Sequence, residues 1–222
     1  MTDTRHQREG HRPMKGFRST HLAARLALLA SVVAALSCSD SPTAPDIRDI
    51  SQLHQLHVTY DYPQLAATQV NFWAVKGRSA GADLWYHARA GATDSSKFVE
   101  FRMGPDALDH RPDGSAITVG DSVLITLTAT DPHHMTIQYE PSGLKFAATA
   151  QPTLKIFWVA CGDDVNYDGK VDSADTSIVS QFAIWRQEVA NGPWERLPTV
   201  VVAGSKEVDS ALSGFSGYAL MY

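Results

Sequence analysis

Hydrophobic and polar residues alternate with a period of two over most of the chain from about Val70 onward. The run Val-Leu-Ile-Thr-Leu-Thr-Ala-Thr at residues 123–130 shows the pattern most clearly and is rich in β-branched side chains. Because alternate residues of a strand face opposite sides of a sheet, the pattern predicts strands with one buried face. Similar runs occupy residues 84–89, 98–102, 135–139, 154–159, 182–186, 199–203 and 217–222.

Turn-forming residues separate these runs at short intervals. The turn signals are Asp113–Gly114, Gly120–Asp121, Asp131–Pro132, Pro141–Ser142–Gly143 and Asn191–Gly192–Pro193. Short strands at regular spacing with such turns are typical of antiparallel sandwiches and barrels. The sequence therefore predicts an all-β fold, and no long helical period competes with it.

The first 37 residues differ from the rest of the chain. Six Lys and Arg residues lie within residues 5–25, and an apolar run follows at residues 26–36. This run is shorter than the roughly 20 apolar residues that span a bilayer. A basic leader followed by a short apolar stretch predicts a secretory signal peptide over residues 1–37. Met14 opens a shorter leader, so translation starts at either Met1 or Met14.

The end of the signal segment is Ala35-Leu36-Ser37-Cys38, which resembles the lipobox of bacterial lipoproteins. The resemblance implies cleavage before Cys38 and acylation of its sulfur. The alternatives are an ordinary signal peptide with a chance cysteine and a transmembrane anchor. Residues 38–65 are expected to form a lipidated N-terminus and flexible tether, and residues 66–222 the folded domain. Cys161, the second of two cysteines, then has no partner and is expected to be a buried thiol.

Export changes the net charge of the protein. Removing residues 1–37 takes away six of the 19 Lys and Arg and two of the 24 Asp and Glu, which leaves a net charge of −9. An acidic surface of this kind argues against nucleic acid as a partner. Contact with the membrane is expected through the acyl chains alone, with another envelope protein as the partner of the folded domain.

The stretch from Phe101 to Phe146 resembles the ZU-five-type domain of zonula occludens scaffolds, Unc-five netrin receptors, ankyrins and bacterial surface proteins. The shared segments are Gly104-Pro105-Asp106-Ala107-Leu108, a strand from Val123, Tyr139-Glu140-Pro141-Ser142-Gly143-Leu144-Lys145-Phe146, and a closing segment at residues 212–220. The resemblance covers about residues 70–222. It implies an antiparallel β-sandwich whose usual role is contact with other proteins.

Some members of that family cut their own chain between Phe and Ser of a His-Phe-Ser segment. Here Gly214 stands in the place of the histidine, ahead of Phe215 and Ser216. Because this chemistry needs a base beside the serine hydroxyl, we expect the chain to stay whole. Phe215 is expected to lie in the core of an intact structural strand.

Residues 164–175 fit a twelve-position calcium loop inserted between two strands. Gly169 occupies position six, where the chain turns sharply, and Val171 at position eight is expected to point into the protein. Lys170 at position seven needs to contribute only its carbonyl oxygen. The expected ligands of Ca²⁺ are Asp164, Asn166, Asp168, Lys170, Asp172 and Asp175.

This loop resembles the calcium loops of dockerins, which also have Asp at position twelve. A dockerin needs two such loops and this chain has one, so a loop between strands is expected rather than a cohesin-binding module. The alternative is a solvated acidic turn that binds nothing. Residues 176–180 are expected to begin a short helix after the loop.

Other candidate chemistry is sparse, and no serine-hydrolase elbow, phosphate-binding glycine loop or zinc-protease motif is present. The pairs His54-x-x-His57 and His133–His134 could bind a metal, but we see no acidic or thiolate partners nearby in the sequence, and surface histidines explain them better. Five tryptophans could stack on sugars or fill a core.

The sequence therefore leaves three candidate functions. The leading expectation is a non-enzymatic protein-interaction or structural module in the cell envelope. A surface-displayed carbohydrate-binding module would show a row of two or three exposed Trp or Tyr side chains on one sheet face. A hydrolase would show a deep pocket with converging carboxylates.

Overall fold

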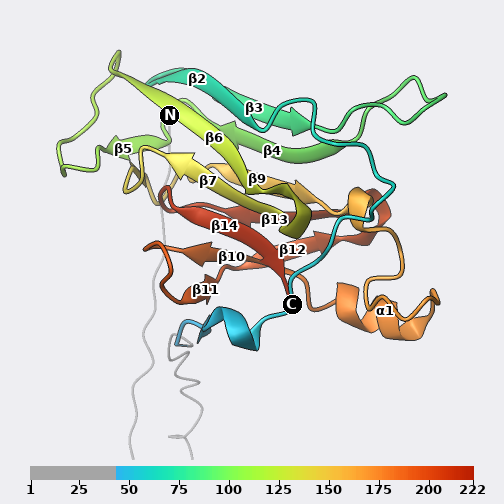
Figure 1. Ribbon diagram of the computed structural model, residues 1–222. Helices are drawn as coiled ribbons and strands as arrows, with labels where there is room; N and C mark the ends of the chain where they lie inside the picture. Colours follow the sequence, from blue (N-terminus) through green and yellow to red (C-terminus); the bar gives the residue numbers. More distant parts are fainter. Residues whose placement is uncertain (1–43) are drawn as a thin grey trace, which may run out of the picture. The chain divides into compact units, whose positions relative to one another are not determined.

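The alternation at residues 122–131 forms the longest strand of the protein, β6 (Ser122–Asp131), in a computed structural model that describes residues 44–222. Val123, Ile125, Leu127 and Ala129 of this strand are buried, while the residues between them face outward or are half-buried. The same alternation builds two antiparallel sheets that pack face to face, so the expected all-β sandwich is confirmed (Figure 1).

Seven strands form the first sheet, and five form the second. The first has the order β1 (Ile47–Arg48), β11 (Trp194–Arg196), β10 (Ala183–Gln187), β14 (Gly217–Met221), β7 (Thr136–Glu140), β6 and β2 (Gln69–Val75). The second has the order β12 (Thr199–Val202), β13 (Glu207–Ala211), β9 (Thr153–Phe157), β4 (Lys97–Met103) and β3 (Ala80–Trp85).

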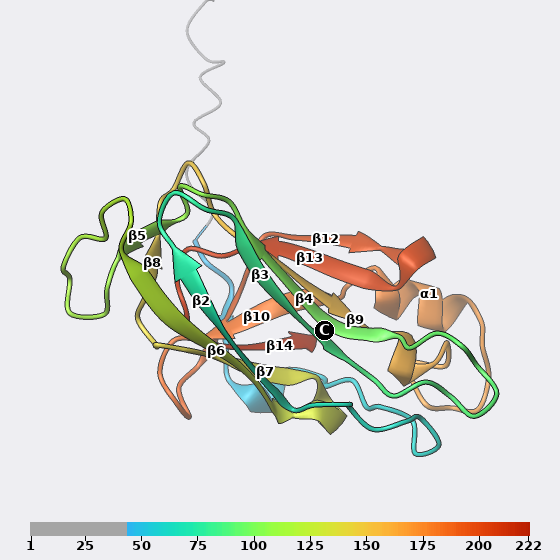
Figure 2. The same cartoon turned by 90° about the horizontal axis from the view of Figure 1, so that it is seen from above.

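Shorter elements close the two ends of the sandwich. The pair β5 (Leu108–His110) and β8 (Lys145–Phe146) lies at one end, and the single α-helix of the described residues, α1 (Ser173–Val179), lies at the other (Figure 2). The helix expected at residues 176–180 thus begins three residues earlier. Within residues 44–222, no helix is long and apolar enough to cross a membrane.

Aromatic side chains fill the space between the sheets. Phe101 on β4 lies 5.1 Å from Tyr139 on β7 and 5.6 Å from Phe215, measured between ring centroids. Tyr139 and Phe215 stack on each other at 4.6 Å, and Phe146 meets Phe215 edge-on at 4.9 Å. Because each ring removes a large apolar area from water, this cluster is the centre of the core.

The folded domain begins earlier than expected. β1 pairs with β11, Leu56 is fully buried in the main core, and Leu53 packs into a second apolar cluster with Trp185 and Trp194. The tether expected over residues 38–65 is therefore wrong over residues 47–65, whose apolar side chains cover the sandwich. The signal peptide and Cys38 lie outside the described residues.

Close packing explains the glycine at position 214. Phe215 is buried in the core as expected, although it lies in the segment before β14 rather than on the strand itself. A Cβ atom on Gly214 would lie 2.7 Å from the backbone oxygen of Leu144, so a histidine does not fit there without a shift of the backbone. The Ser216 side chain is also buried, at 1% exposure.

Cys161 is fully buried in the 3₁₀ turn η3 (Val159–Cys161), which confirms the expectation of a buried thiol, and it has no disulfide partner within residues 44–222. Its sulfur lies 3.3 Å from the sulfur of Met135. Burial raises the pKa of the thiol to about 12, so it stays protonated and behaves as a small apolar group.

Candidate metal centre

The calcium-type loop of residues 164–175 follows η3 and leads into α1, at one end of the sandwich (Figure 1). Asp164 at position one organises its first half, because the two carboxylate oxygens accept hydrogen bonds from Asp168 N at 3.2 Å and Gly169 N at 2.8 Å. Gly169 has a φ of +85°, a conformation that glycine adopts without strain. The sharp turn expected at position six is therefore present.

Two further side chains fold back onto the loop backbone. The side-chain oxygen Oδ1 of Asn166 accepts a hydrogen bond from Asp168 N at 3.0 Å, and Oδ1 of Asp168 accepts one from Lys170 N at 2.9 Å. Such side-chain acceptors stabilise turns by replacing backbone partners. Each carboxylate oxygen has two lone pairs, so an oxygen that accepts one amide keeps a second acceptor position.

Asp175 at position twelve ties the two halves of the loop together. It is only 3% exposed, and its Oδ1 accepts from Val165 N at 2.9 Å and Asn166 N at 3.3 Å, while its Oδ2 accepts from Asp172 N at 2.9 Å. These amides, the one from Asp172 above all, lower the pKa of the carboxyl group below its ordinary value despite the opposing effect of desolvation. The buried carboxylate is therefore ionised at neutral pH.

Asp172 at position nine is an N-cap of α1. Its Oδ1 accepts from Ala174 N at 2.7 Å, and with Asp175 it forms a capping box. The residue is exposed, so its carboxylate serves the helix terminus and not the interior of the loop.

The residue that pins the loop to the protein differs from the expected one. Val171 at position eight is 68% exposed, whereas Val165 at position two is fully buried in the main core. Tyr167 at position four adds a second attachment, because its hydroxyl oxygen accepts from His57 N at 2.5 Å and donates to His57 O at 3.2 Å. Desolvation raises the pKa of this hydroxyl to about 12, so it keeps the proton that it donates.

The six expected ligands therefore lie in one short loop, but their oxygens face backbone amides rather than a common point. Within residues 44–222, no group of three or more His, Cys, Asp or Glu side chains is arranged to hold a metal ion. The donor set itself suits a hard cation such as Ca²⁺, because the five oxygen-bearing side chains and the Lys170 carbonyl offer only oxygen ligands.

Two of the four histidines that were expected at the surface lie next to each other. The His57 and His134 rings lie 4.7 Å apart, and His134 Nδ1 lies 2.7 Å from Asp131 Oδ2. His54 stacks instead on Tyr222 at 5.2 Å, and His133 is exposed. The spacing Asp131-x-x-His134 was a local signal for one of these contacts, but nothing in the sequence indicated that His57 would lie beside His134.

The five tryptophans divide between the core and the surface. Trp158, Trp185 and Trp194 are buried, and Trp85 on β3 is 37% exposed. Trp73 on β2 is 63% exposed and lies opposite Leu124 on β6, which is 46% exposed. Trp73 and Trp85 lie on strands of different sheets, so the described tryptophans form no exposed row on one face.

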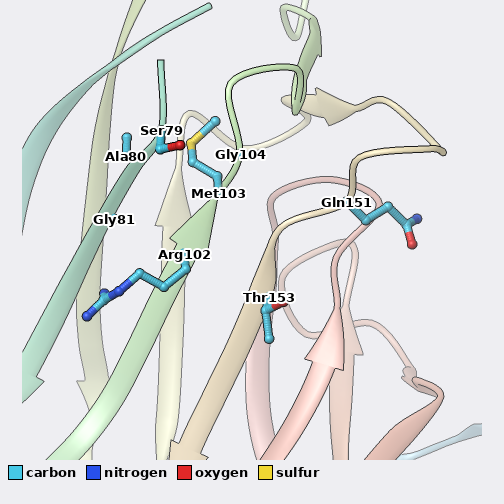
Figure 3. Close-up of a pocket in the computed structure, with 8 residues that line it drawn as sticks. All are labelled: Ser79, Ala80, Gly81, Arg102, Met103, Gly104, Gln151 and Thr153. Carbon is cyan, nitrogen blue, oxygen red and sulfur yellow. The ribbon is translucent and has the colours of Figure 1, made fainter. Parts of the chain in front are cut away.

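A shallow depression lies where β3 and β4 approach the start of β9 (Figure 3). Its lining residues are Ser79, Ala80, Gly81, Arg102, Met103, Gly104, Gln151 and Thr153. Arg102 is its one charged residue, and the guanidinium extends away from Gln151 and Thr153 to pair with Asp83 at 2.6 Å. The lining of this depression contains no carboxylate.

Comparison with known proteins places the chain in no group, since no family model, curated protein or solved structure matches it.

The lowered pKa of Asp175 predicts a defined pH dependence of stability. A carboxyl group whose pKa is lower in the folded state contributes its stabilisation above its ordinary pKa of 3.8, and loses it as the pH falls through the folded value. We therefore expect Asp175→Asn to unfold at lower urea concentration than wild type at neutral pH. The difference in the free energy of unfolding should narrow below about pH 4.

Urea unfolding of both proteins over a series of pH values measures this difference. Asp94→Asn, at an exposed site in the loop between β3 and β4, is the control and should match wild type throughout. A difference between Asp175→Asn and wild type that is constant over the whole pH range would contradict the role assigned to the ionised carboxylate.

Proposed function

We propose that the protein is an exported envelope lipoprotein, anchored through Cys38, whose β-sandwich is a non-enzymatic module that contacts another envelope protein. The observation that carries this proposal is the exposed pair of Trp73 and Leu124 on an otherwise polar sheet face. A large aromatic side chain that is left in water with an apolar neighbour is typical of the energetic centre of a protein interface.

The two halves of the outer face of the seven-stranded sheet differ. Over β10, β11 and β14, Leu53 of the N-terminal segment packs on Trp185, Trp194, Ala183, Ala219 and Met221. Over β2, β6 and β7 nothing within the described residues covers the outward side chains, which include Trp73. We refer to the outward residues of β2, β6 and β7 as the open face. The open face is where a partner has room to bind.

Two rows of polar side chains lie beside Trp73 on the open face, and all of them except Glu140 are uncharged. Gln69, Thr128 and Gln138 lie opposite one another across the three strands, and Asn71, Thr126 and Glu140 form the next row. Amides and hydroxyls can pair with backbone groups of a partner without the large desolvation penalty of buried charges. An apolar centre with a polar surround is the usual anatomy of a protein interface.

The outer face of the five-stranded sheet has a different character. Its charges pair with one another: Arg102 with Asp83 at 2.6 Å, and Lys155 with Asp209 at 3.0 Å and Glu207 at 3.1 Å. The side chains of these ion pairs are 16–48% exposed and each charge already has a partner, so these pairs are expected to contribute little to binding. The contrast between the two faces favours the open face as the binding surface.

Carbohydrate binding is the second candidate, because Trp73 beside amide and hydroxyl side chains could also stack on a sugar ring. A single exposed tryptophan on the face offers one stacking position, whereas binding along a polysaccharide uses several. Protein interaction therefore has more support, and replacement of Trp73 separates it from carbohydrate binding.

The loop of residues 164–175 has a structural role in this proposal. We infer that Ca²⁺ binds among its carboxylates and fixes the end of the sandwich through Val165 and Tyr167, which attach the loop to the core and to the N-terminal segment. Ca²⁺ offsets the mutual repulsion of the clustered carboxylates.

Replacement of Trp73 tests the open face. The mature chain carrying Cys38→Ser is immobilised, and a detergent extract of the envelope of the cells that produce the protein is passed over it. The bound protein is then identified, and its affinity for the immobilised chain is measured. We expect Trp73→Ala to weaken binding by about 30-fold, since loss of a central aromatic costs 2 kcal/mol or more. Trp85→Ala, on the opposite sheet, is the matched control and should bind as wild type does.

Equal binding by Trp73→Ala and wild type would contradict the proposal. Retention on insoluble envelope polysaccharide that depends on Trp73, with no bound protein, would favour the carbohydrate alternative instead.

Thermal melting tests the calcium loop. A ligand present at ten times its dissociation constant stabilises a protein by about 1.4 kcal/mol, which is about 3–6 °C for a domain of this size. We expect millimolar Ca²⁺ to produce such a rise and Mg²⁺ much less, because Mg²⁺ releases its water reluctantly. Asp168→Ala should abolish the rise. Lys170→Ala should retain it, because only the carbonyl of Lys170 is a ligand. Identical melting curves in Ca²⁺, Mg²⁺ and chelator would show that the loop is an ordinary acidic turn.

A further inference from the structure

Two histidines that are far apart in the sequence meet at the end of the sandwich that carries the calcium-type loop. His57 belongs to the N-terminal segment, and His134 to the 3₁₀ turn η2 (Pro132–His134) between β6 and β7. Their ring centroids lie 4.7 Å apart, with the rings inclined at 72°. His57 is exposed, and the side chain of His134 is 32% exposed, so solvent reaches both rings.

The backbones that carry the two rings are held in place. Val58 N donates to His133 O at 3.0 Å, which joins the N-terminal segment directly to η2. On the other side, the Tyr167 hydroxyl bonds to both the amide and the carbonyl of His57. The closeness of the rings therefore follows from fixed backbone positions and does not depend on side-chain rotamers alone.

Asp131 holds the His134 ring in the manner of a metal ligand. Its Oδ2 lies 2.7 Å from His134 Nδ1, and its Oδ1 accepts from the His134 backbone amide at 3.2 Å. A carboxylate at Nδ1 keeps the proton on that nitrogen and leaves the lone pair on Nε2. Histidines that bind metals usually have this carboxylate partner, which fixes the tautomer and makes the ligating nitrogen more basic.

The ring separation matches that of a histidine pair on one metal ion. Zn–N bonds of about 2.0–2.1 Å in a tetrahedral arrangement place the two ring centroids about 5 Å apart. The observed separation of 4.7 Å is close to this value, so the two rings lie near enough to share one ion. Asp131 also caps η2 through the His134 amide, so the carboxylate holds the His134 ring in place before any metal binds.

We propose that His57 and His134 form a binding site for a borderline divalent cation such as Zn²⁺, with Asp131 as the outer carboxylate and water completing the coordination. Imidazole nitrogen selects Zn²⁺, Cu²⁺ and Ni²⁺ over Ca²⁺, so this site is chemically distinct from the oxygen-rich loop. The site is open to solvent and has two protein ligands, so it binds reversibly. It is independent of the proposed protein contact at Trp73.

Calorimetric titration of Zn²⁺ into the untagged mature chain carrying Cys38→Ser tests the site, because a free thiol at residue 38 would itself bind Zn²⁺. Excess Ca²⁺ is present to occupy the acidic loop. We expect one saturable site, weakened about tenfold or more in His57→Gln and in His134→Gln, and about tenfold in Asp131→Asn. His54→Gln and His133→Gln remove neighbouring exposed imidazoles and should bind as wild type. Melting curves without metal establish that each variant is folded.

A second readout uses wild type alone, so that no variant has to fold. Zn²⁺ should shift the imidazole NMR resonances of His57 and His134 together, at the concentration where the heat saturates, and leave those of His87 and His110 unchanged. The absence of saturable heat, undiminished affinity in His57→Gln and His134→Gln, or shifts confined to other histidines would each overturn the proposal.

Discussion

Phe101 on β4 packs against Tyr139 on β7 and Phe215 ahead of β14, and through these rings the two sheets share one core. A sheet that is apolar on one face has to bury that face against another layer. Aromatic rings bury the most area for each side chain, so their contact fixes which strands face each other. The close approach of Gly214 to the Leu144 carbonyl is a consequence, because Phe215 reaches the core only if the backbone before it packs without a side chain.

The polar features of the protein depend on elements that this core positions. Its last strand, β14, ends at Met221, and the backbone of the next residue, Tyr222, pairs with His54 and so draws the N-terminal segment along the sheet. That segment carries Leu53 and Leu56 into the apolar clusters and brings His57 next to Tyr167 and His134. The calcium-type loop, the histidine pair and the N-terminal segment therefore meet at one end of the sandwich.

Strands could be predicted from the sequence because their alternation is a local property of the chain. The loop from Asp164 to Asp175 could be predicted for a similar reason, since turns formed by Asp, Asn and Gly are set by neighbouring residues. Which of its valines is buried could not, because Val165 and Val171 differ only in what the distant core offers them.

The domain boundary and the histidine pair depend on contacts between distant segments. The N-terminal segment was expected to be a tether because its apolar residues Ile47, Ile50, Leu53 and Leu56, which recur at every third residue, do not alternate as in a strand. The burial of Leu53 depends on a surface built by β10, β11 and β14, more than a hundred residues later in the chain, and that of Leu56 depends on the main core. The contact of His57 with His134 has the same origin, so no local pattern could indicate it.

The proposed function depends on where the protein resides, because Trp73 on the open face can meet an envelope partner only if the chain is exported and held at the membrane. The N-terminal peptide of the protein isolated from its own membranes tests this most directly. Mass spectrometry should find a mature chain that begins at Cys38 and carries acyl chains, and Cys38→Ser should lose both the acyl mass and partition into detergent. A mature N-terminus at another residue, or an unmodified Cys38 in a protein that still partitions into detergent, would contradict the account.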